Sequence, residues 1–309
     1  AGGFSHNVAR RQANYRHAPT GQEHWSPTVE SNTGDTFALF EALGGRIDDH
    51  LPNAAAWSPV SLTRRADGSQ GVMPHFIDRA KPGVIAVTAK GQRFTNEANS
   101  YHDYVQAMIK ACEGEAETCS WLICDHHTLR RYGLGCVAPF PLPIGRHLKS
   151  GYLLKGATIE ALAESAGIDA RHLKQTVETF NQHAASGQDP QFGKGSKAYN
   201  RYQGDALHQP NPCLKEINQG PFYAVKIYPG DIGTYNGIPV DNHNRALNKA
   251  GEPICGLFAI GNDATSIMGG NYPGAGITLG PALTFGYAVA KYIAGQQNEL
   301  INNEIKKAS

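Results

Sequence analysis

The sequence predicts a mixed fold, in which an α/β part is combined with an inserted α+β part. Residues 256–295 show a short apolar run, then a glycine-rich loop, then apolar residues at helical spacing. Strand-like runs and amphipathic helical stretches alternate through the middle of the chain. Thirty-five glycines and 18 prolines among 309 residues fit an α/β enzyme rich in tight turns, and they exclude a coiled coil or a disordered tail.

The stretch from residue 256 onward carries the clearest local pattern. Leu257–Ile260 is apolar, bounded by glycines and too short for a helix, which indicates a buried strand. A polar turn follows at Gly261–Asp263, and four glycines lie in the loop between residues 269 and 276. From about Thr278 the apolar residues take helical spacing, and Gly295 is the expected end of that helix.

A strand, a glycine loop and a helix in this order bring backbone N–H groups and a helix N-terminus against an electron-rich ligand. Glycines at such a place remove the Cβ atoms that would bar a flat ligand. The alternative is a glycine-rich loop that only lets the helix pack closely.

The remaining elements are read from apolar periodicity and turn residues. They are strands at 84–87, 94–97, 120–124 and 222–227, and helices at 35–43, 101–111, 158–166 and 169–185. Asp35 is a candidate N-cap for the first helix. Residues 57–79 contain prolines and a glycine and are expected to form a loop. The layout implied is one domain built from residues 1–60 and 225–309, with residues 61–224 inserted into it.

Composition bounds the function classes. A net charge of +1 gives no reason to expect a nucleic-acid or membrane-surface partner, and no apolar run approaches the ~18 residues of a membrane span. Six cysteines without C-x-x-C spacing indicate reduced thiols in a cytoplasmic protein. The adjacent His126 and His127 point apart on any regular element, so we expect no metal site. His75 and His208 are candidates for contact with the substrate. The alternative interpretation, which is the more common case for histidines, is that both are solvated.

Two sequence blocks resemble a known family. GLFAIGND followed by MGGNYPGAGITLGPALTFGY is similar to the C-terminal signature of the flavoproteins that group 3-ketosteroid dehydrogenases with fumarate reductases. NYPGAG-x-TLGPAL resembles the 3-ketosteroid Δ1-dehydrogenase branch. Further matching blocks lie at residues 81–108 and 191–234, so the resemblance runs from end to end of the chain.

The resemblance implies FAD as the cofactor, and it implies that residues 1–60 and 225–309 are the remnant of a flavin-binding, Rossmann-like domain. The insert would then be a cap that carries substrate contacts. The sequence contains no G-x-G-x-x-G followed by an acidic residue. We therefore expect the chain to be the C-terminal portion of a longer flavoprotein. Gly2 and Gly3 resemble the end of a strand of that domain and are expected cofactor contacts.

Tyr101 is the expected base. It lies four residues after Glu97, where the resemblance implies an arginine in fumarate reductases and a tyrosine in ketosteroid dehydrogenases. A phenol with a pKa near 10 must be lowered, or relay its proton, to abstract a carbon-bound proton at neutral pH. The alternative is a tyrosine that only packs at a helix start.

The second expected group stabilises negative charge on the substrate. By resemblance, the Tyr272 hydroxyl and the Gly276 N–H hold the carbonyl oxygen of the substrate, as in an oxyanion hole. Tyr272 as an aromatic wall for the flavin is the alternative. The other expected flavin contacts are Gly261, Asn262 and Asp263 at the strand end, and Ile277, Thr278 and Leu279 at the helix start.

The expected function is an FAD-dependent oxidoreductase acting on CH–CH bonds, which dehydrogenates a 3-ketosteroid-like cyclic ketone and passes electrons to an acceptor. Two rivals remain open. A fumarate-type dicarboxylate reductase would need paired arginines, for which Arg79, Arg93 and Arg146 are the candidates. The other rival is an inactive C-terminal fragment, because family members contribute a further tyrosine from the N-terminal part.

Overall fold

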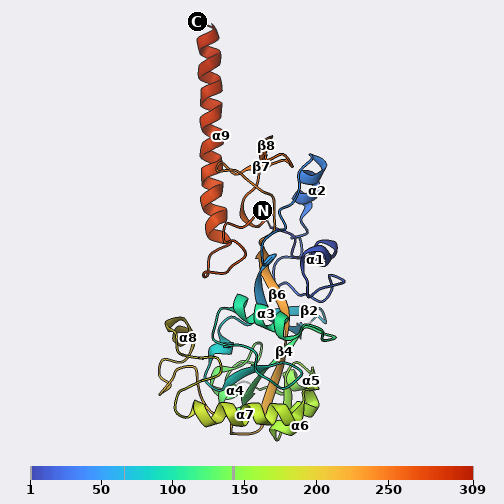
Figure 1. Ribbon diagram of the computed structural model, residues 1–309, viewed down its shortest axis with the longest axis vertical. Helices are drawn as coiled ribbons and strands as arrows, with labels where there is room; N and C mark the ends of the chain where they lie inside the picture. The colour runs from blue at the N-terminus through green and yellow to red at the C-terminus, as the bar shows by residue number, and fades with distance from the viewer. Residues whose placement is uncertain (1, 66, 141–142, 309) are drawn as a thin grey trace. The chain divides into compact units, whose positions relative to one another are not determined.

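The computed structural model describes residues 2–65, 67–140 and 143–308, with side chains up to residue 295. These residues form two compact units, and each is described by itself (Figure 1). Unit 1 contains residues 1–22, 28–56 and 232–309, and unit 2 contains residues 23–27 and 57–231. The unit boundaries fall within two strands, at 56/57 and 231/232, whereas the sequence places domain boundaries at 60/61 and 224/225. The assignment of the parts to flavin and substrate stays a prediction.

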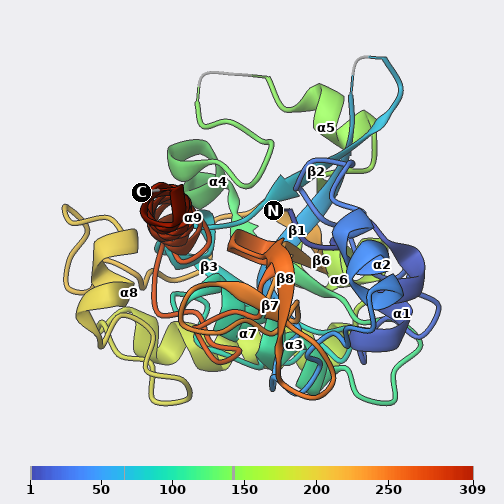
Figure 2. The ribbon, with the colours of Figure 1, turned by 90° about the horizontal axis from the view of Figure 1, so that it is seen from above.

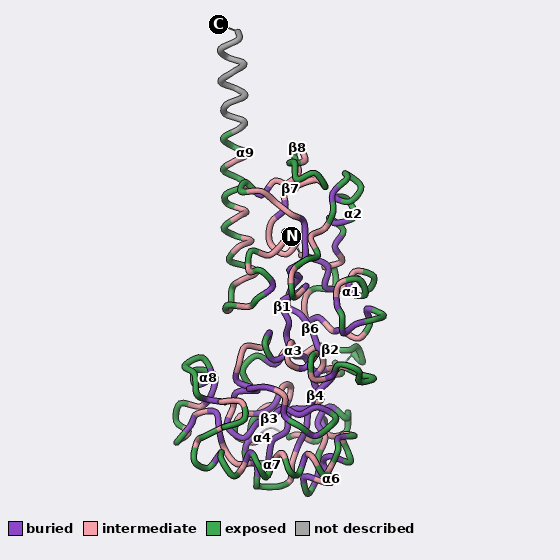
Figure 3. The backbone as a smooth tube through the Cα atoms, in the orientation of Figure 1, coloured by how far each residue is buried: buried purple, intermediate pink, exposed green. Residues whose placement is uncertain are grey.

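Unit 2 is built on one six-stranded sheet. Its strand order is β2-β1-β6-β4-β3, and β5 also pairs with β6. The strands are β1 (Ala55–Arg64), β2 (Gln70–Pro74), β3 (Val84–Val87), β4 (Ser120–Asp125), β5 (Leu154–Gly156) and β6 (Phe222–Thr234). The β1–β2, β3–β4, β4–β6 and β5–β6 pairs are antiparallel. The neighbouring strands β3 and β4, at one end of this order, are buried at every residue, and Figure 3 colours this region mostly purple.

Two helices supply most of the apolar cover of this sheet: α6 (Ile159–Ala166) and α7 (Ala170–Ala184) (Figure 1). The predicted stripe of α7 is buried and packs into the same core as the strands. Its members are Leu173, Val177, Phe180 and Ala184. Burying a leucine, valine or phenylalanine side chain stabilises the fold by roughly 1.5–3 kcal/mol. The Asp169 carboxylate caps α7 by accepting from the His172 N–H at 2.8 Å.

The remaining helices of unit 2 are short and lie between the strands in the sequence. They are η1 (Asp78–Ala80), α3 (Tyr101–Ala111), α4 (His126–Tyr132), α5 (Gly145–Lys149) and α8 (Ala198–Gln203). The α3 bounds agree with the expected helix at 101–111. Ser100 caps this helix, because its side chain accepts from the Asp103 N–H at 3.1 Å.

Unit 1 combines helices with a small antiparallel ribbon. Its elements are α1 (Val8–Asn14), α2 (Asp35–Ala42), β7 (Arg245–Leu247), β8 (Pro253–Phe258), η2 (Gly261–Asp263) and α9 (Leu279–Ala308). β7 and β8 pair with each other, and Figure 2 shows them as an orange ribbon. The rings of Phe4, Tyr15 and Phe37 form a buried aromatic cluster, with centroids 5.7 and 6.0 Å apart. The Rossmann-like character of this unit stays a prediction.

The sequence-based prediction of the elements is wrong at five places. Asp35 is the first residue of α2 rather than its N-cap, which is Gly34. The buried strand expected at Leu257–Ile260 is instead β8, which spans Pro253–Phe258 and is exposed or half-buried. Residues 57–79 are not a loop but most of the β1–β2 hairpin, whose register begins beyond Pro59 with Val60 opposite Pro74. Residues 94–97 form no strand, because only an isolated bridge joins Val87 to Arg93. The last helix does not end at Gly295 but continues to Ala308. A lone glycine costs a helix only about 1 kcal/mol, which is too little to end it.

All six cysteines are free thiols, and five are buried or half-buried. Among the helices of the described residues, none is both long and apolar enough to cross a membrane.

Candidate functional site

A cavity of about 300 Å³ lies in unit 1 beside the polar turn that follows β8. Four of the expected flavin contacts line it: Gly261, Asn262, Ile277 and Thr278. The other lining residues come from β6, the loop after it, the turn at 241–244, the segment 264–267 that follows η2, and the first turns of α9. They are Thr234, Tyr235, Val240, Asp241, Asn242, Asn244, Ala264, Thr265, Ser266, Ile267, Pro281 and Phe285.

The turn that follows β8, Gly261–Asp263, is held in place by the hydrogen bonds of the Asp263 side chain. This carboxyl group is buried, and it accepts from the Gly3 N–H at 2.8 Å and from the Thr36 hydroxyl at 2.8 Å. Gly3 has φ = 75°, and a Cβ there would collide with Thr234 and Asn262. Asp263 and Gly3 therefore hold each other in place. Their expected contact with the flavin stays a prediction, as does that of Gly2.

The glycine loop is anchored to unit 1 at two carbonyl groups. The Asn53 side chain donates to the Gly270 carbonyl at 2.8 Å, and the Tyr235 hydroxyl donates to the Asn271 carbonyl at 2.9 Å. Burial raises the pKa of Tyr235, and the neighbouring Tyr272 phenol raises it further. Tyr235 is therefore a neutral donor. Its proximity places the half-buried Tyr272 beside the anchored part of the loop.

Gly276 is the glycine whose backbone conformation matters most. It has φ = 93°, and it is exposed with no atom within 4 Å of an added Cβ. Its carbonyl accepts from the Gly280 N–H at 2.7 Å, so Gly276 leads directly into α9. The first N–H groups of a helix lack intrahelical partners. Here the Gly280 and Ala282 N–H groups already donate to the Gly276 and Thr278 carbonyls, and Pro281 has no N–H. The donors left to a ligand, with partial positive charge, are therefore the N–H groups of Leu279 and of the two residues before it.

These residues fit the ring end of a flavin better than its phosphate end. The cavity wall combines amide and hydroxyl donors with apolar Ile267, Pro281 and Phe285, which suits a flat ring with an electron-rich edge. Open space at Gly276 lets a ligand approach the backbone. None of the described cavity residues is a lysine or arginine that would pair with a phosphate. Leu279 opens α9 but is exposed and lies outside the cavity lining.

Several cavity residues are missing from the sequence-based prediction. Thr234 is the last residue of the matching block at residues 191–234, and Tyr235 follows it directly, so that block was the signal for them. Asn244 had no such signal. Its positive φ of 59° places it in a turn whose position depends on the β7–β8 pairing, which is a tertiary contact.

Tyr101 belongs to unit 2 and is the first residue of α3. It is half-buried, and its ring lies 4.8 Å from the Phe76 ring, at an angle of 53°. Glu97, four residues earlier in the sequence, is fully buried. The segment between them therefore leads from a buried anchor to a side chain that reaches the surface of the unit.

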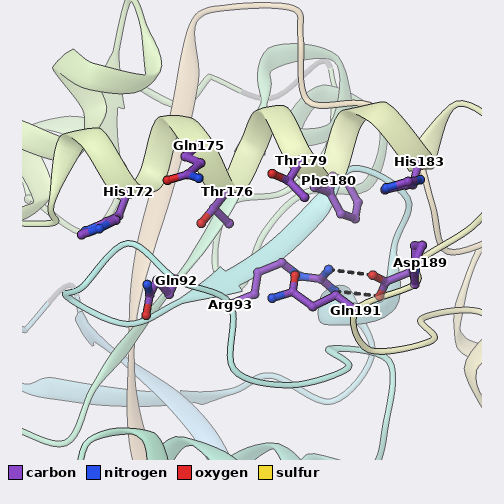
Figure 4. Close-up of a pocket in the computed structure, with 11 residues that line it drawn as sticks. Gln92, Arg93, His172, Gln175, Thr176, Thr179, Phe180, His183, Asp189 and Gln191 are labelled. Atoms are coloured by element: carbon purple, nitrogen blue, oxygen red, sulfur yellow. Dashed lines mark hydrogen bonds and ion pairs between the residues drawn. The ribbon is translucent and has the colours of Figure 1, made fainter.

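Glu97 is held by a buried ionic network. Its carboxylate accepts from the Ala86 N–H at 3.0 Å and from two nitrogens of Arg93 at 2.8 and 2.9 Å. Arg93 also forms two 2.9 Å hydrogen bonds to Asp189, visible in Figure 4. Burial alone would raise the pKa of Glu97, but Arg93 and Lys194 lower it below the ordinary value. Glu97 is therefore an ionised structural anchor.

A second chain of hydrogen bonds begins at His75, the residue before Phe76. The His75 ring contacts Asp78 at 2.6 Å and the Ser61 hydroxyl at 2.7 Å, and Ser61 contacts the Tyr152 hydroxyl at 2.8 Å. His75 is fully buried, so the expectation of a solvated histidine is wrong there. The hairpin β1–β2, which the sequence did not predict, carries Ser61 into this chain. His208 contacts the Leu214 carbonyl at 2.8 Å.

Of the three arginines named for a dicarboxylate site, two are buried and bonded to protein groups, and the third is exposed. Arg93 pairs with Glu97 and Asp189. Arg79 donates only to backbone carbonyls, and Arg146 is an exposed residue that donates to the His147 ring at 3.2 Å. Within the described side chains of unit 2, these three therefore do not form the paired fork that a dicarboxylate requires.

Comparison with known proteins places this geometry in context. Residues 1–279 match the family model described as "FAD binding domain". A 4-oxocyclohex-2-ene-1-carboxylate 5-dehydrogenase from Sinomonas cyclohexanicum is 46% identical, over 95% of this chain and 50% of that protein. A 3-oxosteroid 1-dehydrogenase from Mycolicibacterium smegmatis is 39% identical, over 95% of this chain and 51% of that protein.

Among solved structures, the chain is similar to a 3-ketosteroid Δ1-dehydrogenase from Sterolibacterium denitrificans, in complex with 1,4-androstadiene-3,17-dione. The TM-score is 0.87 at 39% identity, and the match covers 96% of this chain and 52% of that one. The chain thus spans about half the length of the relatives that it matches.

Proposed function

The chain belongs to the FAD-binding flavoprotein family that groups 3-ketosteroid dehydrogenases with fumarate reductases, and from this premise we propose that it takes part in the α,β-dehydrogenation of a cyclic ketone. FAD is the cofactor of the family. The observation that carries the proposal is Tyr101 at the start of α3, half-buried and four residues after the ionised anchor Glu97. A tyrosine at this place supplies a proton acceptor rather than a guanidinium for a carboxylate.

We propose that the Tyr101 phenolate oxygen removes a proton from the carbon next to the ketone. The electron pair left on that carbon shifts toward the carbonyl oxygen, where negative charge develops. As the carbon–carbon double bond forms, a hydride leaves the neighbouring β carbon, and FAD, when bound, is the group that accepts it. One proton and one hydride are lost, so the substrate is oxidised by two electrons.

The charge that develops on the carbonyl oxygen needs fixed donors. We propose the Tyr272 hydroxyl and the Gly276 N–H for this role. The anchoring of their loop by Asn53 and Tyr235 supports it, because donors that need not reorganise stabilise a developing charge most strongly. The N–H groups at the start of α9 would meet the electron-rich edge of the flavin ring.

The proposed substrate class is a ring ketone rather than a steroid in particular. Both curated relatives carry names that combine a ring ketone with a dehydrogenase, and one of these ketones is a monocyclic carboxylate. The engaged state of Arg79 and Arg93 argues against a dicarboxylate. An electron acceptor that reoxidises the flavin is the proposed second partner.

The test uses the FAD-loaded protein with a 3-ketosteroid, a 4-oxocyclohexanecarboxylate and fumarate. Tyr101→Phe keeps the ring and should lower the rate of flavin reduction by about 100-fold or more, because proton abstraction is lost. Tyr272→Phe should lower the same rate by about 100-fold, with a smaller effect on substrate affinity. Rapid mixing separates the rate of flavin reduction from the dissociation constant of the substrate.

Tyr202→Phe is the matched control, because this tyrosine is 88% exposed on α8, and it should reduce flavin at the parental rate. Parental rates in both active-site variants would remove Tyr101 and Tyr272 from the mechanism. A parental protein inert to both ketones but reoxidised by fumarate would replace the proposal with the dicarboxylate reading.

A further inference from the structure

Arg79 is the largest side chain in the described structure that is completely buried. All of its hydrogen bonds go to backbone carbonyl oxygens, which is unusual for a buried guanidinium because carboxylates are its common partners. Nε donates to the His75 carbonyl at 2.8 Å, and Nη1 donates to the Glu97 carbonyl at 2.6 Å. Nη2 donates to the Phe76 carbonyl at 3.2 Å, and both Nη atoms reach the Asn99 carbonyl at 3.3 Å.

We propose that Arg79 is a positioning residue for Tyr101, an inference that rests on the proposed function. Glu97 and Asn99 lie in the segment that leads into Tyr101 at the start of α3. His75 and Phe76 lie in the turn after β2, and the Phe76 ring packs on the Tyr101 ring at 4.8 Å. One guanidinium thus fixes both the backbone that delivers Tyr101 and the ring against which Tyr101 packs.

Each of the two segments that Arg79 joins is also held from elsewhere. The turn is fixed by the His75 ring, which lies between Asp78 and Ser61. The segment before Tyr101 is fixed by the ion pair of Glu97 with Arg93 and by the Asn200 side chain, which donates to the Ala98 carbonyl at 2.9 Å. Arg79 donates to carbonyls of both segments and so joins two separately anchored pieces.

The chemistry of the guanidinium explains why a different cation would not serve. Its five N–H donors lie in one rigid plane, so it bonds carbonyls on opposite sides at once, whereas an ammonium group presents three donors from a single point. The Arg79 plane also lies over the Tyr104 ring, with 5.0 Å from Cζ to the ring centroid. Burial lowers the pKa of Arg79, and its contacts to carbonyl dipoles offset the cost of burying the charge.

Position matters here because a base must lie within hydrogen-bond reach of the proton that it removes. A misplacement of about 1 Å costs up to about 100-fold in rate. Arg79→Lys should therefore lower the rate of flavin reduction by about 10- to 100-fold, with the substrate dissociation constant changed much less.

A double-mutant cycle separates positioning from general destabilisation. If Arg79 acts through Tyr101, Arg79→Lys in the Tyr101→Phe background should change the remaining rate less than about twofold. Equal rate losses in both backgrounds would overturn the inference. Arg131→Lys is the matched control, because Arg131 lies in the same unit, is half-exposed and pairs with Asp205 at 3.0 Å. It should leave the rate of flavin reduction unchanged in either background.

A second readout needs no turnover. 3-Fluorotyrosine at position 101 should give one sharp ¹⁹F resonance in the parent, and a shifted or split resonance in Arg79→Lys, because the ring loses its fixed surroundings. An unchanged resonance would contradict the inference. Should Tyr101→Phe keep the parental rate, the proposed base would be wrong, while the fluorine measurement would still decide whether Arg79 positions this ring.

Arg79→Met is the second variant if Arg79→Lys does not fold. It keeps an extended side chain without a buried charge, and such replacements of buried ionic groups are often tolerated. The near-ultraviolet circular dichroism of the folded variant checks the fold. The same cycle and the same resonance shift are expected, and additive rates with an unmoved resonance would overturn the inference in this variant too.

Discussion

At the scale of single residues, the chain commits several charges to buried anchors rather than to chemistry. Glu97, Arg93, Asp189 and Lys194 are all buried, and they neutralise one another in one network. Removing one member of a buried ion pair leaves its partner uncompensated in a medium of low polarity, which costs about 3–5 kcal/mol. The network therefore makes the segment before Tyr101 sensitive to a change of charge.

Glu97→Gln tests this network through its dependence on pH. The pKa of Glu97 is lowered in the folded protein, so its ionisation stabilises the fold above the unfolded value of about 4.3. That stabilisation is lost as the pH falls through the lower folded value. We expect Glu97→Gln to cost about 3 kcal/mol at pH 7, and the difference from the parent should shrink below about pH 4.

Denaturant unfolding at several pH values measures this difference. The matched control is Glu160→Gln, which removes an exposed pair with Lys174 at 2.7 Å and should have little effect at any pH. A Glu97→Gln variant as stable as the parent at pH 7, or one whose deficit grows in acid, would contradict the prediction.

At the scale of elements, local sequence signals succeeded where one segment decides its own structure. The α3 helix and its cap at Ser100 follow from local residues, as do the buried strand β3 and the stripe of α7. The β1–β2 hairpin was missed because Pro59 indicates a loop, whereas Pro59 lies inside β1 and the pairing with β2 begins just after it, at Val60. His75 was misread for the same reason, since it is buried at the end of this hairpin, where its ring contacts Ser61 of β1.

The candidate site follows the same division. Motifs adjacent in sequence named Gly261, Asn262, Ile277 and Thr278 as flavin contacts; the fold brings these residues to one cavity, and their contact with the flavin stays a prediction. Arg79 was named only as a substrate arginine, and the sequence gives no sign of its carbonyl contacts. Those contacts join residues 75–76 to 97–99, which no local pattern relates.

Two glycines of the loop–α9 segment, Gly276 and Gly295, provide a prediction at this scale. An added Cβ meets nothing within 4 Å at either Gly276 or Gly295, but Gly276 has φ = 93° and Gly295 lies inside α9. Gly295→Ala should stabilise the helix by up to about 1 kcal/mol. Gly276→Ala should destabilise the fold by about 1–3 kcal/mol. An alanine there would be strained by the positive φ, although its Cβ meets no other atom.

Thermal unfolding followed by circular dichroism compares the two variants directly. Because both sites are sterically open, each serves as the control for the other. Equal effects of the same sign would show that the left-handed conformation of Gly276 is not maintained in solution.

At the scale of the whole molecule, the chain offers more groups suited to the flavin ring of FAD than to its phosphates. The cavity in unit 1 offers donors and apolar walls suited to a flavin ring. The described cavity residues include no basic side chain for phosphate, and the 309-residue sequence contains no G-x-G-x-x-G fingerprint. A phosphate-cradling helix terminus supplies a large part of dinucleotide affinity. The affinity of this chain for FAD should therefore be limited to what the ring contacts provide.

We accordingly predict that the 309-residue chain, titrated alone, binds FAD with a dissociation constant above about 10 µM, which corresponds to less than about 7 kcal/mol of binding free energy. Free riboflavin should bind nearly as well as FAD, because the ring contacts are shared and the pyrophosphate adds little. Calorimetric titration of both ligands measures the two constants. Thr278→Pro, which removes an N–H group next to the start of α9, should weaken both ligands equally. Stoichiometric, sub-micromolar binding of FAD with no detectable binding of riboflavin would show that the phosphates are held by residues of this chain, and that the cavity beside Asn262 is not where most of the affinity arises.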